Sequence, residues 1–409
     1  MTATIDSKGL ARETVDALLA PAGEAALQAL ATADLDEANT LTLLTDLRRT
    51  FAPALAGALL SQARLRRRAA AKFPFADQLF LLPGALEQAT AWPVAQHRAR
   101  WFDQYAPPGP LLDLGCGIGG DTLAPAQQRQ VIAIERDPVR LRFAQANAAR
   151  LGLAERITFL QADWPGLMLA DQLPAAAAAF ADPSRRVGER RLFHLDQIEP
   201  PLDTLLALQA RLPALGVKVM PGVQDDELPP GCGVEFVSHE GVCKEAVLWF
   251  DVLARHKRWA SIHRAGGWAT IVNDGTIAPL GRLEPGLYLH EPDPAVIRAG
   301  ALGVLCERLG AWLFDPQIAY LLSPALPVDA PVQSFAIDEV HRFRLQGLNQ
   351  RLQALRIGEV ELKKRGFPQE PETLRPRLKL QAGGAKATVI LTRRGSERLM
   401  LICRRVSVK

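Results

Sequence analysis

The stretch LLDLGCGIGGD, residues 111–121, passes from an apolar run into a loop that is rich in glycine. Glycine permits positive φ angles and lets the backbone approach a ligand closely. No Gly-Lys-Ser/Thr follows, so the loop is not a phosphate-binding P-loop. A dinucleotide-binding loop remains an alternative, because Gly115, Gly117 and Gly120 have the spacing of the motif G-x-G-x-x-G. The extra Gly119 and the preceding Asp113 favour a different cofactor.

Short apolar runs alternate with helical segments on both sides of this loop. Seven runs are candidate strands, and the last two lie close enough in the chain to form an antiparallel pair. The runs cover residues 110–115, 130–135, 157–162, 175–180, 216–221, 233–238 and 245–253. The alternation is typical of an α/β fold built on a parallel sheet.

Three acids come at the ends of the first three runs. Asp113 lies near the end of the first run, Glu135 ends the second, and Asp163 follows the third. Open α/β sheets bind ligands in the crevice outside the carboxyl ends of their strands. The three carboxylates are therefore expected to share one crevice with the glycine loop.

The fourth run, AAAAAF, leads directly into Asp182-Pro183-Ser184-Arg185-Arg186. One interpretation is a buried strand that leaves the core and turns. The other is a strand end that carries a reacting group. The acids of the upstream strands favour the second interpretation.

These features resemble motif I and the following acids of the class I S-adenosylmethionine-dependent methyltransferases, whose loop reads D-x-G-x-G-x-G. Over most of its length the chain is similar to bacterial members with a C-terminal THUMP-like domain, and distantly similar to cap trimethylguanosine synthases. The similarity also includes FPFADQLFLLPGALEQAT (73–90), FADPSRR, VKVMPGV, CKEAVLWF, LHEPDPAVIRAG and LKKRGF. The resemblance implies a Rossmann-like, seven-stranded α/β sheet with a helical N-terminal region and a small α+β C-terminal domain.

The expected domain division follows from this resemblance and from the helical periodicity of the first segment. We expect a helical region over 1–72, a methyltransferase domain over 73–254, and a basic THUMP-like domain over 255–409. Residues 73–105 would link the first two or cover the cofactor.

The resemblance also implies a site for S-adenosyl-L-methionine. Glu135 would bind the ribose hydroxyls, since a carboxylate offers two acceptor oxygens to a diol. Asp163 would bind the adenine amine, and Asp113 would face the cationic methionine end. The predicted cofactor contacts are Asp113, Gly115, Cys116, Gly117, Gly119, Asp121, Glu135, Arg136, Asp163, Trp164 and Asp182. No metal site is expected.

Methyltransferases that act on exocyclic or ring nitrogens often carry [DNS]-P-P-[YFW] after the fourth strand. Asp182 and Pro183 match the first half of that motif, whereas Ser184 and Arg185 do not match the second. We predict that these four residues are catalytic, with Asp182 accepting a hydrogen bond that aligns the target amine. Alignment matters more than basicity in this displacement.

A charge asymmetry points to the substrate. Residues 341–409 contain 17 Lys and Arg against 5 Asp and Glu, a net charge of +12, so the rest of the chain carries −8 of the total of +4. A basic tail favours a polyanion such as RNA, although a solvated basic face is equally open. The predicted substrate contacts are Glu87, Gln88, Arg185, Arg186, Lys363, Lys364 and Arg365.

Each of these substrate predictions has a structural alternative. Arg185 and Arg186 could stack on a base or bind phosphate, but they could also pair with Glu189 or Asp163. The segment from Glu87 to Thr90 is expected to begin a helix, where it would either cover the methionine end or cap the helix. Structural roles are favoured for three further residues, His194, His239 and Trp249.

Composition limits the remaining possibilities. The five cysteines are scattered without paired metal spacing, which favours reduced thiols and a cytoplasmic protein. No apolar run approaches about 18 residues, so no membrane span is expected. The oligomeric state stays open, with a monomer slightly favoured.

The leading function is S-adenosylmethionine-dependent methylation of a nitrogen in rRNA or tRNA. The alternatives are a small-molecule or protein methyltransferase, and a non-catalytic protein that binds cofactor and RNA.

Overall fold

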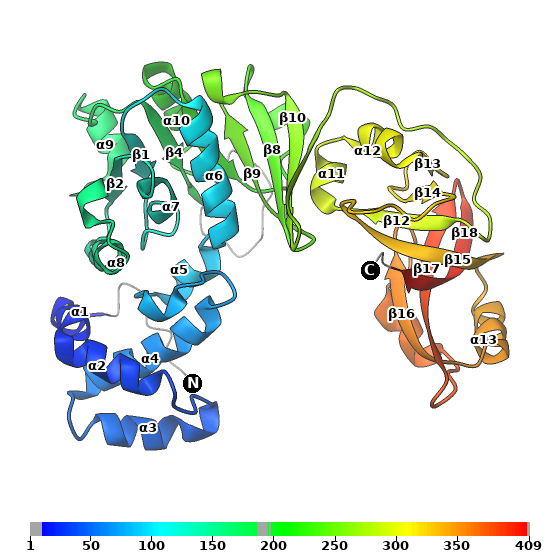
Figure 1. The fold of residues 1–409 in the computed structure, drawn as a ribbon, viewed down its shortest axis with the longest axis horizontal. Coiled ribbons are helices and arrows are strands. Elements are labelled where there is room, and N and C mark those ends of the chain that lie inside the picture. Colours follow the sequence, from blue (N-terminus) through cyan, green and yellow to red (C-terminus); the bar gives the residue numbers. More distant parts are fainter. Residues whose placement is uncertain (1–9, 186–194, 196–197, 407–409) are drawn as a thin grey trace. The chain divides into compact units, whose positions relative to one another are not determined.

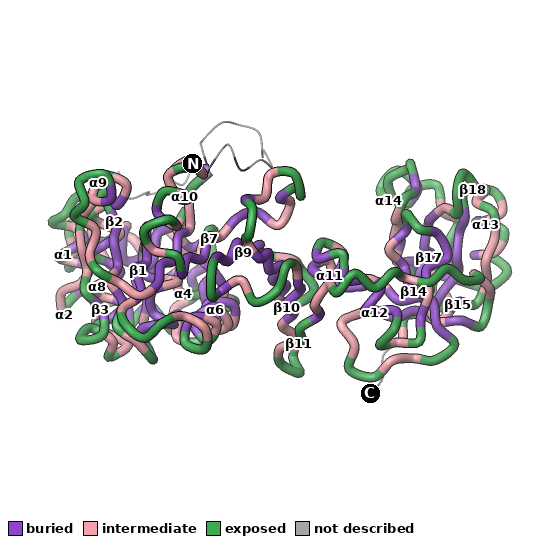
Figure 2. Tube along the Cα trace, turned by 90° about the horizontal axis from the view of Figure 1, so that it is seen from above, coloured by how far each residue is buried: buried purple, intermediate pink, exposed green. Residues whose placement is uncertain are grey.

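The computed structural model describes residues 10–185, 195 and 198–406. The chain forms two compact units. Unit 1 consists of Met1–Gly233 and Val247–Arg255, and unit 2 consists of Val234–Ala246 and His256–Lys409. Figure 1 labels the helices and strands, and Figure 2 shows buried residues concentrated along the strands of each unit.

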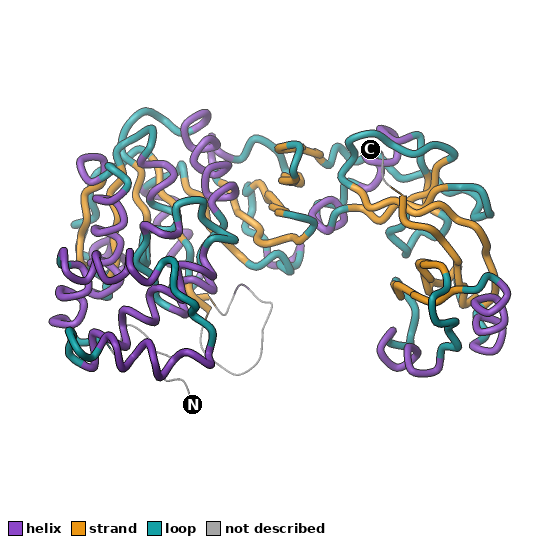
Figure 3. The backbone as a smooth tube through the Cα atoms, turned by 60° about the horizontal axis from the view of Figure 1, so that its bottom comes forward, coloured by secondary structure: helices purple, strands orange, loops and turns teal. Residues whose placement is uncertain are grey.

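The N-terminal region of unit 1 is helical, as predicted (Figure 3). Proline occupies the first turn of two of these helices, where its missing N–H costs no hydrogen bond. Leu18 and Leu59 from these helices are fully buried in the same apolar cluster as Phe143, which lies on a helix of the α/β sheet. The four helices are α1 (Arg12–Leu19), α2 (Pro21–Leu30), α3 (Thr40–Leu47) and α4 (Pro53–Ala69).

Two buried amides join these helices to the rest of unit 1. The side chain of Gln62, on α4, bonds to both backbone groups of Leu81. The side chain of Asn147 bonds to both backbone groups of Phe80 and donates to the carbonyl of Ile118, at 3.0 Å, in the glycine loop. Buried backbone groups need such partners. The extended segment that contains Phe80 and Leu81 is thereby fixed against the glycine loop.

The resemblance implies a seven-stranded sheet, but the sheet has nine strands, and those assigned to unit 1 follow the order β9-β7-β4-β1-β2-β3. β1 runs parallel to β2 and β4, β2 to β3, and β4 to β7. The strands are β1 (Leu111–Leu114), β2 (Val131–Glu135), β3 (Ile157–Gln161), β4 (Ala178–Ala181), β7 (Leu215–Val219) and β9 (Val242–Trp249). The first half of β9 belongs to unit 2. A short antiparallel pair follows β4, formed by β5 (Ser184–Arg185) and β6 (Ile198–Glu199).

Helices that precede β1 or connect the strands pack against this sheet. They are α5 (Pro83–Gln88), α6 (Trp92–Tyr105), α7 (Leu123–Ala126), α8 (Pro138–Arg150), α9 (Trp164–Leu169) and α10 (Leu202–Arg211). Trp249 is fully buried, as expected of a core residue, and its ring lies 5.2 Å from that of Phe102 on α6. A Cβ at Gly216 would lie 2.7 Å from the Trp249 ring, so this close packing requires glycine in β7.

Unit 2 contains two groups of strands. In the first group, β8 (Gly233–His239) runs parallel to β10 (Arg258–Arg264), which pairs antiparallel with β11 (Gly267–Val272). The second group is a seven-stranded sheet of order β13-β14-β12-β15-β18-β17-β16. Its strands are β12 (Tyr288–Pro292), β13 (Trp312–Leu313), β14 (Leu321–Ser323), β15 (Val332–Arg342), β16 (Ile357–Lys364), β17 (Ala385–Arg394) and β18 (Glu397–Val406).

Four helices complete the α+β architecture predicted for this part of the chain. They are α11 (Pro294–Arg298), α12 (Leu302–Leu309), α13 (Leu345–Ala354) and α14 (Pro371–Leu374). Leu348 and Leu352 of α13 pack in one apolar cluster with Val389 of β17. None of the described helices is both long and apolar enough to cross a membrane.

All seven predicted strands are present, but some details differ from the sequence-based expectations. β4 begins at Ala178, three residues later than expected, because the polyalanine run carries no side chain that marks the strand start. Glu87 and Gln88 end helix α5 and do not begin a helix, since Pro83 occupies its first turn. The expectation that this segment begins a helix is therefore wrong, and with it the alternative that it caps one.

Candidate cofactor and substrate site

The glycine loop after β1 has the backbone conformation that its sequence predicts. The φ angles of Gly115, Gly117 and Gly119 are 90°, 58° and 93°, a region that favours glycine. A Cβ placed on Gly115 or Gly117 would meet no atom within 4 Å, so the space beside the loop is open. Gly120 does not have a positive φ, and a Cβ placed on it would lie 3.8 Å from the Cβ of Ala89.

Glu135 is buried at the end of β2 and holds the glycine loop in place. Its Oε2 accepts a hydrogen bond from the backbone N–H of Gly117 at 3.0 Å, and its Oε1 accepts one from Asp137 at 2.9 Å. A carboxylate oxygen has two lone pairs, so each oxygen keeps one acceptor site. The open loop and these acceptors fit a ligand that carries a diol.

Asp113 lies in β1 and is 3% exposed. Its carboxylate accepts a hydrogen bond from the hydroxyl of Thr122, which is also fully buried. Burial raises the pKa of Asp113 to about 7, and the negative charges of Asp121 and Asp182 act in the same direction. The Thr122 hydrogen bond and Arg98 oppose this rise in pKa. Asp113 therefore titrates near neutrality.

Asp121 is held by a buried ion pair. Arg98, on α6, is 5% exposed and donates to Asp121 Oδ1, while the Thr90 hydroxyl donates to Oδ2 at 3.1 Å. Burial alone would raise the pKa of Asp121, but the charges of Arg98 and Lys218 outweigh it and lower that pKa. The Arg98 guanidinium also lies 4.1 Å from the ring centroid of Phe180 in β4. The ion pair thus fixes the end of the glycine loop to α6 and β4.

Asp182 lies immediately after β4, and Lys218 of β7 contacts it. The two residues follow the paired positions Ala181 and Val217, so they emerge side by side at the carboxyl edge of the sheet. Lys218 Nζ lies 2.7 Å from Asp182 Oδ2 and 3.2 Å from Thr90 Oγ1. The Asp182 side chain is 35% exposed and that of Lys218 is 16% exposed.

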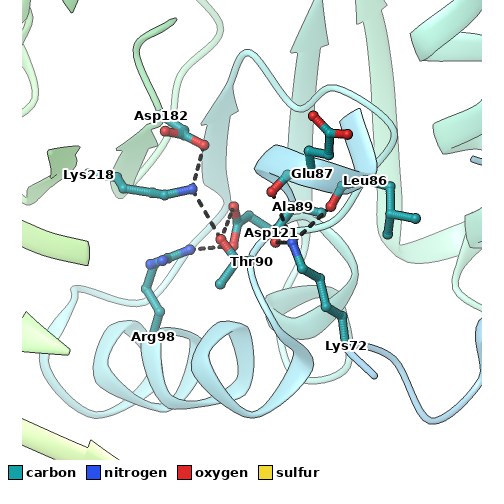
Figure 4. A network of polar contacts seen from close by, with 9 residues as sticks. All are labelled: Lys72, Leu86, Glu87, Ala89, Thr90, Arg98, Asp121, Asp182 and Lys218. Carbon is teal, nitrogen blue, oxygen red and sulfur yellow. Dashed lines mark hydrogen bonds and ion pairs between the residues drawn. The ribbon is translucent and has the colours of Figure 1, made fainter. Parts of the chain in front are cut away.

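A continuous polar network therefore crosses the sheet edge, and Figure 4 shows its members. It runs from Arg98 through Asp121, Thr90 and Lys218 to Asp182. Sequence reasoning missed Arg98 and Lys218. The available signal for Lys218 was a charged residue inside the otherwise apolar strand sequence GVKVM.

Lys72 fixes the segment that carries Thr90 (Figure 4). Its ammonium donates to the carbonyls of Leu86, Glu87 and Ala89 at 2.8, 3.0 and 2.8 Å. These carbonyls lie at the end of α5, where a cation is favourable. The side chains of Glu87 and Gln88 are exposed outside this network, and Glu87 lies 3.8 Å from Arg68.

The remaining predicted cofactor residues surround the loop with different exposure. Cys116 and Trp164 are buried, whereas Arg136 and Asp163 are exposed. Burial raises the pKa of the Cys116 thiol well above its usual range, so this thiol stays neutral. Asp163 precedes helix α9 without capping it by a side-chain hydrogen bond.

The residues after Asp182 are described only in part. Ser184 donates a long hydrogen bond of 3.4 Å to the carbonyl of Glu199, and Pro183 is half-buried. The backbone of Arg185 belongs to β5. Arg186, Glu189 and His194 lie outside the described residues, so the arginine alternatives are not resolved there.

The predicted basic triplet of unit 2 is engaged by acids. Lys363 and Arg365 both pair with Glu291, the latter at 3.3 Å, and Lys364 pairs with Glu370. Lys363 and Lys364 are the last residues of β16. The sequence could not show this pairing, because Glu291 is more than 70 residues away along the chain.

A second basic surface of unit 2 lies beside the β17–β18 turn. A shallow cavity there is lined by Arg342, Phe343, Arg344, Ser396, Glu397 and Arg398. Arg342 pairs with Glu397. The exposed guanidinium groups of Arg344 and Arg398 have no hydrogen-bond or ion-pair partner within the described part of the chain. We call these six residues the basic cavity.

Three family profiles match the chain. A methyltransferase domain matches residues 111–183, a THUMP domain-like profile matches 332–405, and a domain of unknown function (DUF8688) matches 11–69. The first match covers the glycine loop, Glu135 and Asp182. The fold is that of a Rossmann-like methyltransferase.

The chain belongs to a family of S-adenosylmethionine-dependent methyltransferases. An uncharacterized member from Mycobacterium tuberculosis, present in strains CDC 1551 and H37Rv, is 35% identical over 351 residues, which cover 83% of this chain and 93% of the relative. A crystal structure from Porphyromonas gingivalis W83, assigned to the methyltransferases, shows the same fold with a TM-score of 0.69. It is 20% identical, and the match covers 91% of this chain and 99% of that one.

A shorter match is to an uncharacterized RNA methyltransferase from Parasynechococcus marenigrum WH8102. It is 33% identical over 117 residues, which cover 27% of this chain and 25% of the relative. The protein is thus an S-adenosylmethionine-dependent methyltransferase, as its glycine loop and strand-end acids predict.

Proposed function

We propose that this enzyme methylates a nitrogen of a base in RNA, with rRNA and tRNA as the expected substrates. The observation that carries the proposal is the Asp182 carboxylate. It stands half-exposed at the same edge of the sheet as the glycine loop and Glu135, and Lys218 holds it there at 2.7 Å. This is the edge where open α/β sheets bind their ligands.

The cofactor would be held by residues that form the open space beside the loop. Glu135 would accept hydrogen bonds from the ribose hydroxyls through the lone pairs that its backbone contacts leave. The backbone of Gly115 and Gly117 would lie against the ligand, and Asp113 would face the methionine end. When bound, S-adenosyl-L-methionine supplies an electrophilic methyl group on a sulfonium.

Asp182 would orient the amine that receives this methyl group. Lys218 occupies Oδ2, while Oδ1 has no partner among the described residues and can accept from a target N–H. That hydrogen bond would aim the nitrogen lone pair at the methyl carbon. The new N–C bond forms as the C–S bond breaks, and the amine then loses a proton to the carboxylate or to water. Correct alignment is the main contribution.

Unit 2 would supply the contacts to RNA. The THUMP domain-like match at 332–405 lies in this unit, the segment 341–409 carries a net charge of +12, and one partial relative is described as an RNA methyltransferase. Within the unit, the basic cavity combines the unpaired Arg344 and Arg398 with Phe343. Such a surface suits phosphate contacts. We propose that residues 1–72, 73–254 and 255–409 are the functional segments. We also propose that the reaction takes place in the cytoplasm.

One observation favours a second candidate, a small-molecule or protein methyltransferase. Lys363, Lys364 and Arg365 all pair with acids, two of them with the same Glu291, and neither position 184 nor position 185 is aromatic. Base recognition would then depend on other groups. The two candidates predict different methyl acceptors in the same extract.

The test is to supply the full chain with S-adenosylmethionine labelled in its methyl group. The acceptors are total RNA, soluble protein and small molecules from cells that lack the gene. Label that enters the RNA fraction and is released by nuclease as a methylated nucleoside would support RNA methylation. Label in protein or in small molecules alone would contradict it. Asp182→Ala is the matched control, because it removes the proposed aligning carboxylate and leaves Glu135 and the glycine loop unchanged.

A further inference from the structure

Two histidines and a glutamate meet at one edge of unit 2, and the methyltransferase chemistry does not use them. His239 ends β8 and is directly paired with His263 in the parallel ladder with β10. Their Nδ1 atoms lie 3.0 Å apart. Glu240 Oε1 lies 3.9 Å from His263 Nδ1. One ligand atom from each of the three residues lies within 4.8 Å of the others.

The backbone fixes this arrangement. Glu240 has a φ of 51° and Gly241 a φ of 74°, so the chain turns tightly from β8 into β9. The N–H of Glu240 donates to the carbonyl of His263 at 3.1 Å. The glutamate is thereby held at the end of the ladder, beside the imidazole that its carboxylate approaches. The pairing of β8 with β10 and the turn after β8 bring the three residues together, so the cluster does not depend on side-chain rotamers alone.

We propose that His239, Glu240 and His263 bind a borderline transition-metal ion such as Zn²⁺. Imidazole and carboxylate are ligands that Zn²⁺ accepts, and two histidines with one glutamate form a known three-ligand set. Zn–N bonds are about 2.0–2.1 Å long, so two nitrogens on one tetrahedral ion lie about 3.3 Å apart. The pair seen at 3.0 Å needs little adjustment. Mg²⁺ and Ca²⁺ prefer sets made of oxygens.

The surroundings leave access to the ligand atoms. His239 and His263 are half-buried, and Glu240 is 62% exposed. The neutral imidazole is the form that binds metal. Lys244 is the nearby cation that opposes metal binding. A bound ion would link the turn between β8 and β9 to β10.

The test uses the full chain, purified without a histidine tag and treated with a chelator. Calorimetric titration with ZnCl₂ should show one site per chain, and MgCl₂ should show none. His239→Ala and His263→Ala should each weaken zinc binding by roughly 10–100-fold or more. Loss of a residue that only hydrogen-bonds to a metal ligand already has an effect of this size. The matched control is His341→Ala, because His341 pairs with Glu339 at 2.7 Å as a single histidine. This control should bind zinc as the wild type does.

Cobalt separates this site from the half-buried thiols of Cys232 and Cys243. Co²⁺ bound to the cluster should give d–d absorption without thiolate charge-transfer bands. Zinc binding by the wild type that is no tighter than by the folded His239→Ala/His263→Ala double variant would overturn the proposal. So would thiolate bands that disappear on changing either cysteine. The metal titration needs no methyl transfer, so its outcome is independent of the proposed RNA substrate.

Discussion

Lys218 Nζ lies 2.7 Å from Asp182 Oδ2 and joins the ends of β7 and β4 at the edge where the glycine loop opens. The same ammonium contacts Thr90, which donates to Asp121. The proposed aligning carboxylate is therefore positioned by residues from four separate segments. Its orientation depends on a network that a single substitution can interrupt.

Asp182→Ala should lower methyl transfer by roughly 10²-fold or more, the loss that misalignment of a reacting group causes. Its affinity for S-adenosylmethionine should stay near that of the wild type, because Asp182 is not expected to contact the adenosine. Asp182→Asn should retain part of the activity, since an amide oxygen still accepts a hydrogen bond. Single-turnover rates together with calorimetry of the cofactor measure both quantities.

Glu135→Ala is the contrasting variant, because it should weaken cofactor binding more than the rate at saturating cofactor. If Asn at 182 were as inactive as Ala, a general-base role would replace the aligning role. A fall in the activity of Asp182→Ala that only follows its folded fraction would make the residue structural.

Lys218→Met should lower the rate of methyl transfer while leaving the chain folded. The substitution keeps most of the apolar length of the side chain but removes the donor shared by Asp182 and Thr90. Loss of a partner for partly buried polar groups costs about 1–3 kcal/mol of unfolding free energy. Chemical denaturation gives this quantity, and single-turnover kinetics give the rate.

Lys218→Arg should recover part of the rate, because a guanidinium can donate to both acceptors. The same rate for Lys218→Met and the wild type would show that Asp182 needs no positioning by the ammonium. Combining Lys218→Met with Asp182→Ala should add little to the loss caused by Asp182→Ala alone, since the lysine acts through the aspartate.

Local features of this protein could be predicted from its sequence. The strands β1 to β3 and the positive φ angles of Gly115 and Gly117 follow from apolar runs and from glycine spacing, which act over a few residues. The position of Glu135 at the carboxyl end of β2 follows from the same pattern. These properties depend on residues that are close together in the sequence. They can therefore be predicted without knowing which strands pair or in which register.

The polar network could not be predicted, because its pairs are distant in sequence. Asp182 and Lys218 are 36 residues apart, and Arg98 and Asp121 are 23 apart. Only the pairing of β4 with β7 brings the first pair together. The basic triplet Lys363, Lys364 and Arg365 shows a different error. Its sequence indicates free charges, but the fold pairs them with acids. A run of like charges indicates an exposed surface, yet Glu291 from β12 pairs with two of the three cations.

The basic cavity should contribute more to RNA binding than other basic residues of unit 2. Arg344→Glu/Arg398→Glu should weaken RNA binding and reduce its dependence on salt, because fewer phosphates are neutralised. Lys386→Glu/Arg404→Glu is a control with the same change in net charge, at residues paired with acids. Affinity for total tRNA and rRNA, measured over a series of salt concentrations, gives both quantities. Equal losses in the two double variants would indicate a general charge effect and contradict a specific surface.

The final prediction concerns the pH dependence of Asp113. Burial raises the pKa of its carboxyl from 3.8 to about 7 in the folded protein. The folded state therefore holds this proton more tightly than the unfolded state does. The stabilisation from this group is fully present below pH 4 and is lost as the pH rises through about 7. Asp113→Asn should reduce the fall in unfolding free energy over this range, as chemical denaturation at pH 5 and pH 7.5 would show.

A cation bound next to Asp113 should reverse the preference for the protonated form. If this carboxyl faces the methionine end, the affinity for S-adenosylmethionine should rise severalfold between pH 5.5 and 7, with a proton released on binding. Methylthioadenosine lacks the charged methionine end and should show a flat profile, as should S-adenosylmethionine with Asp113→Asn. Calorimetry in two buffers of different ionisation enthalpy measures the proton directly. Parallel pH profiles for the two ligands in the wild type would place Asp113 away from the methionine end and leave its carboxyl a structural partner of Thr122.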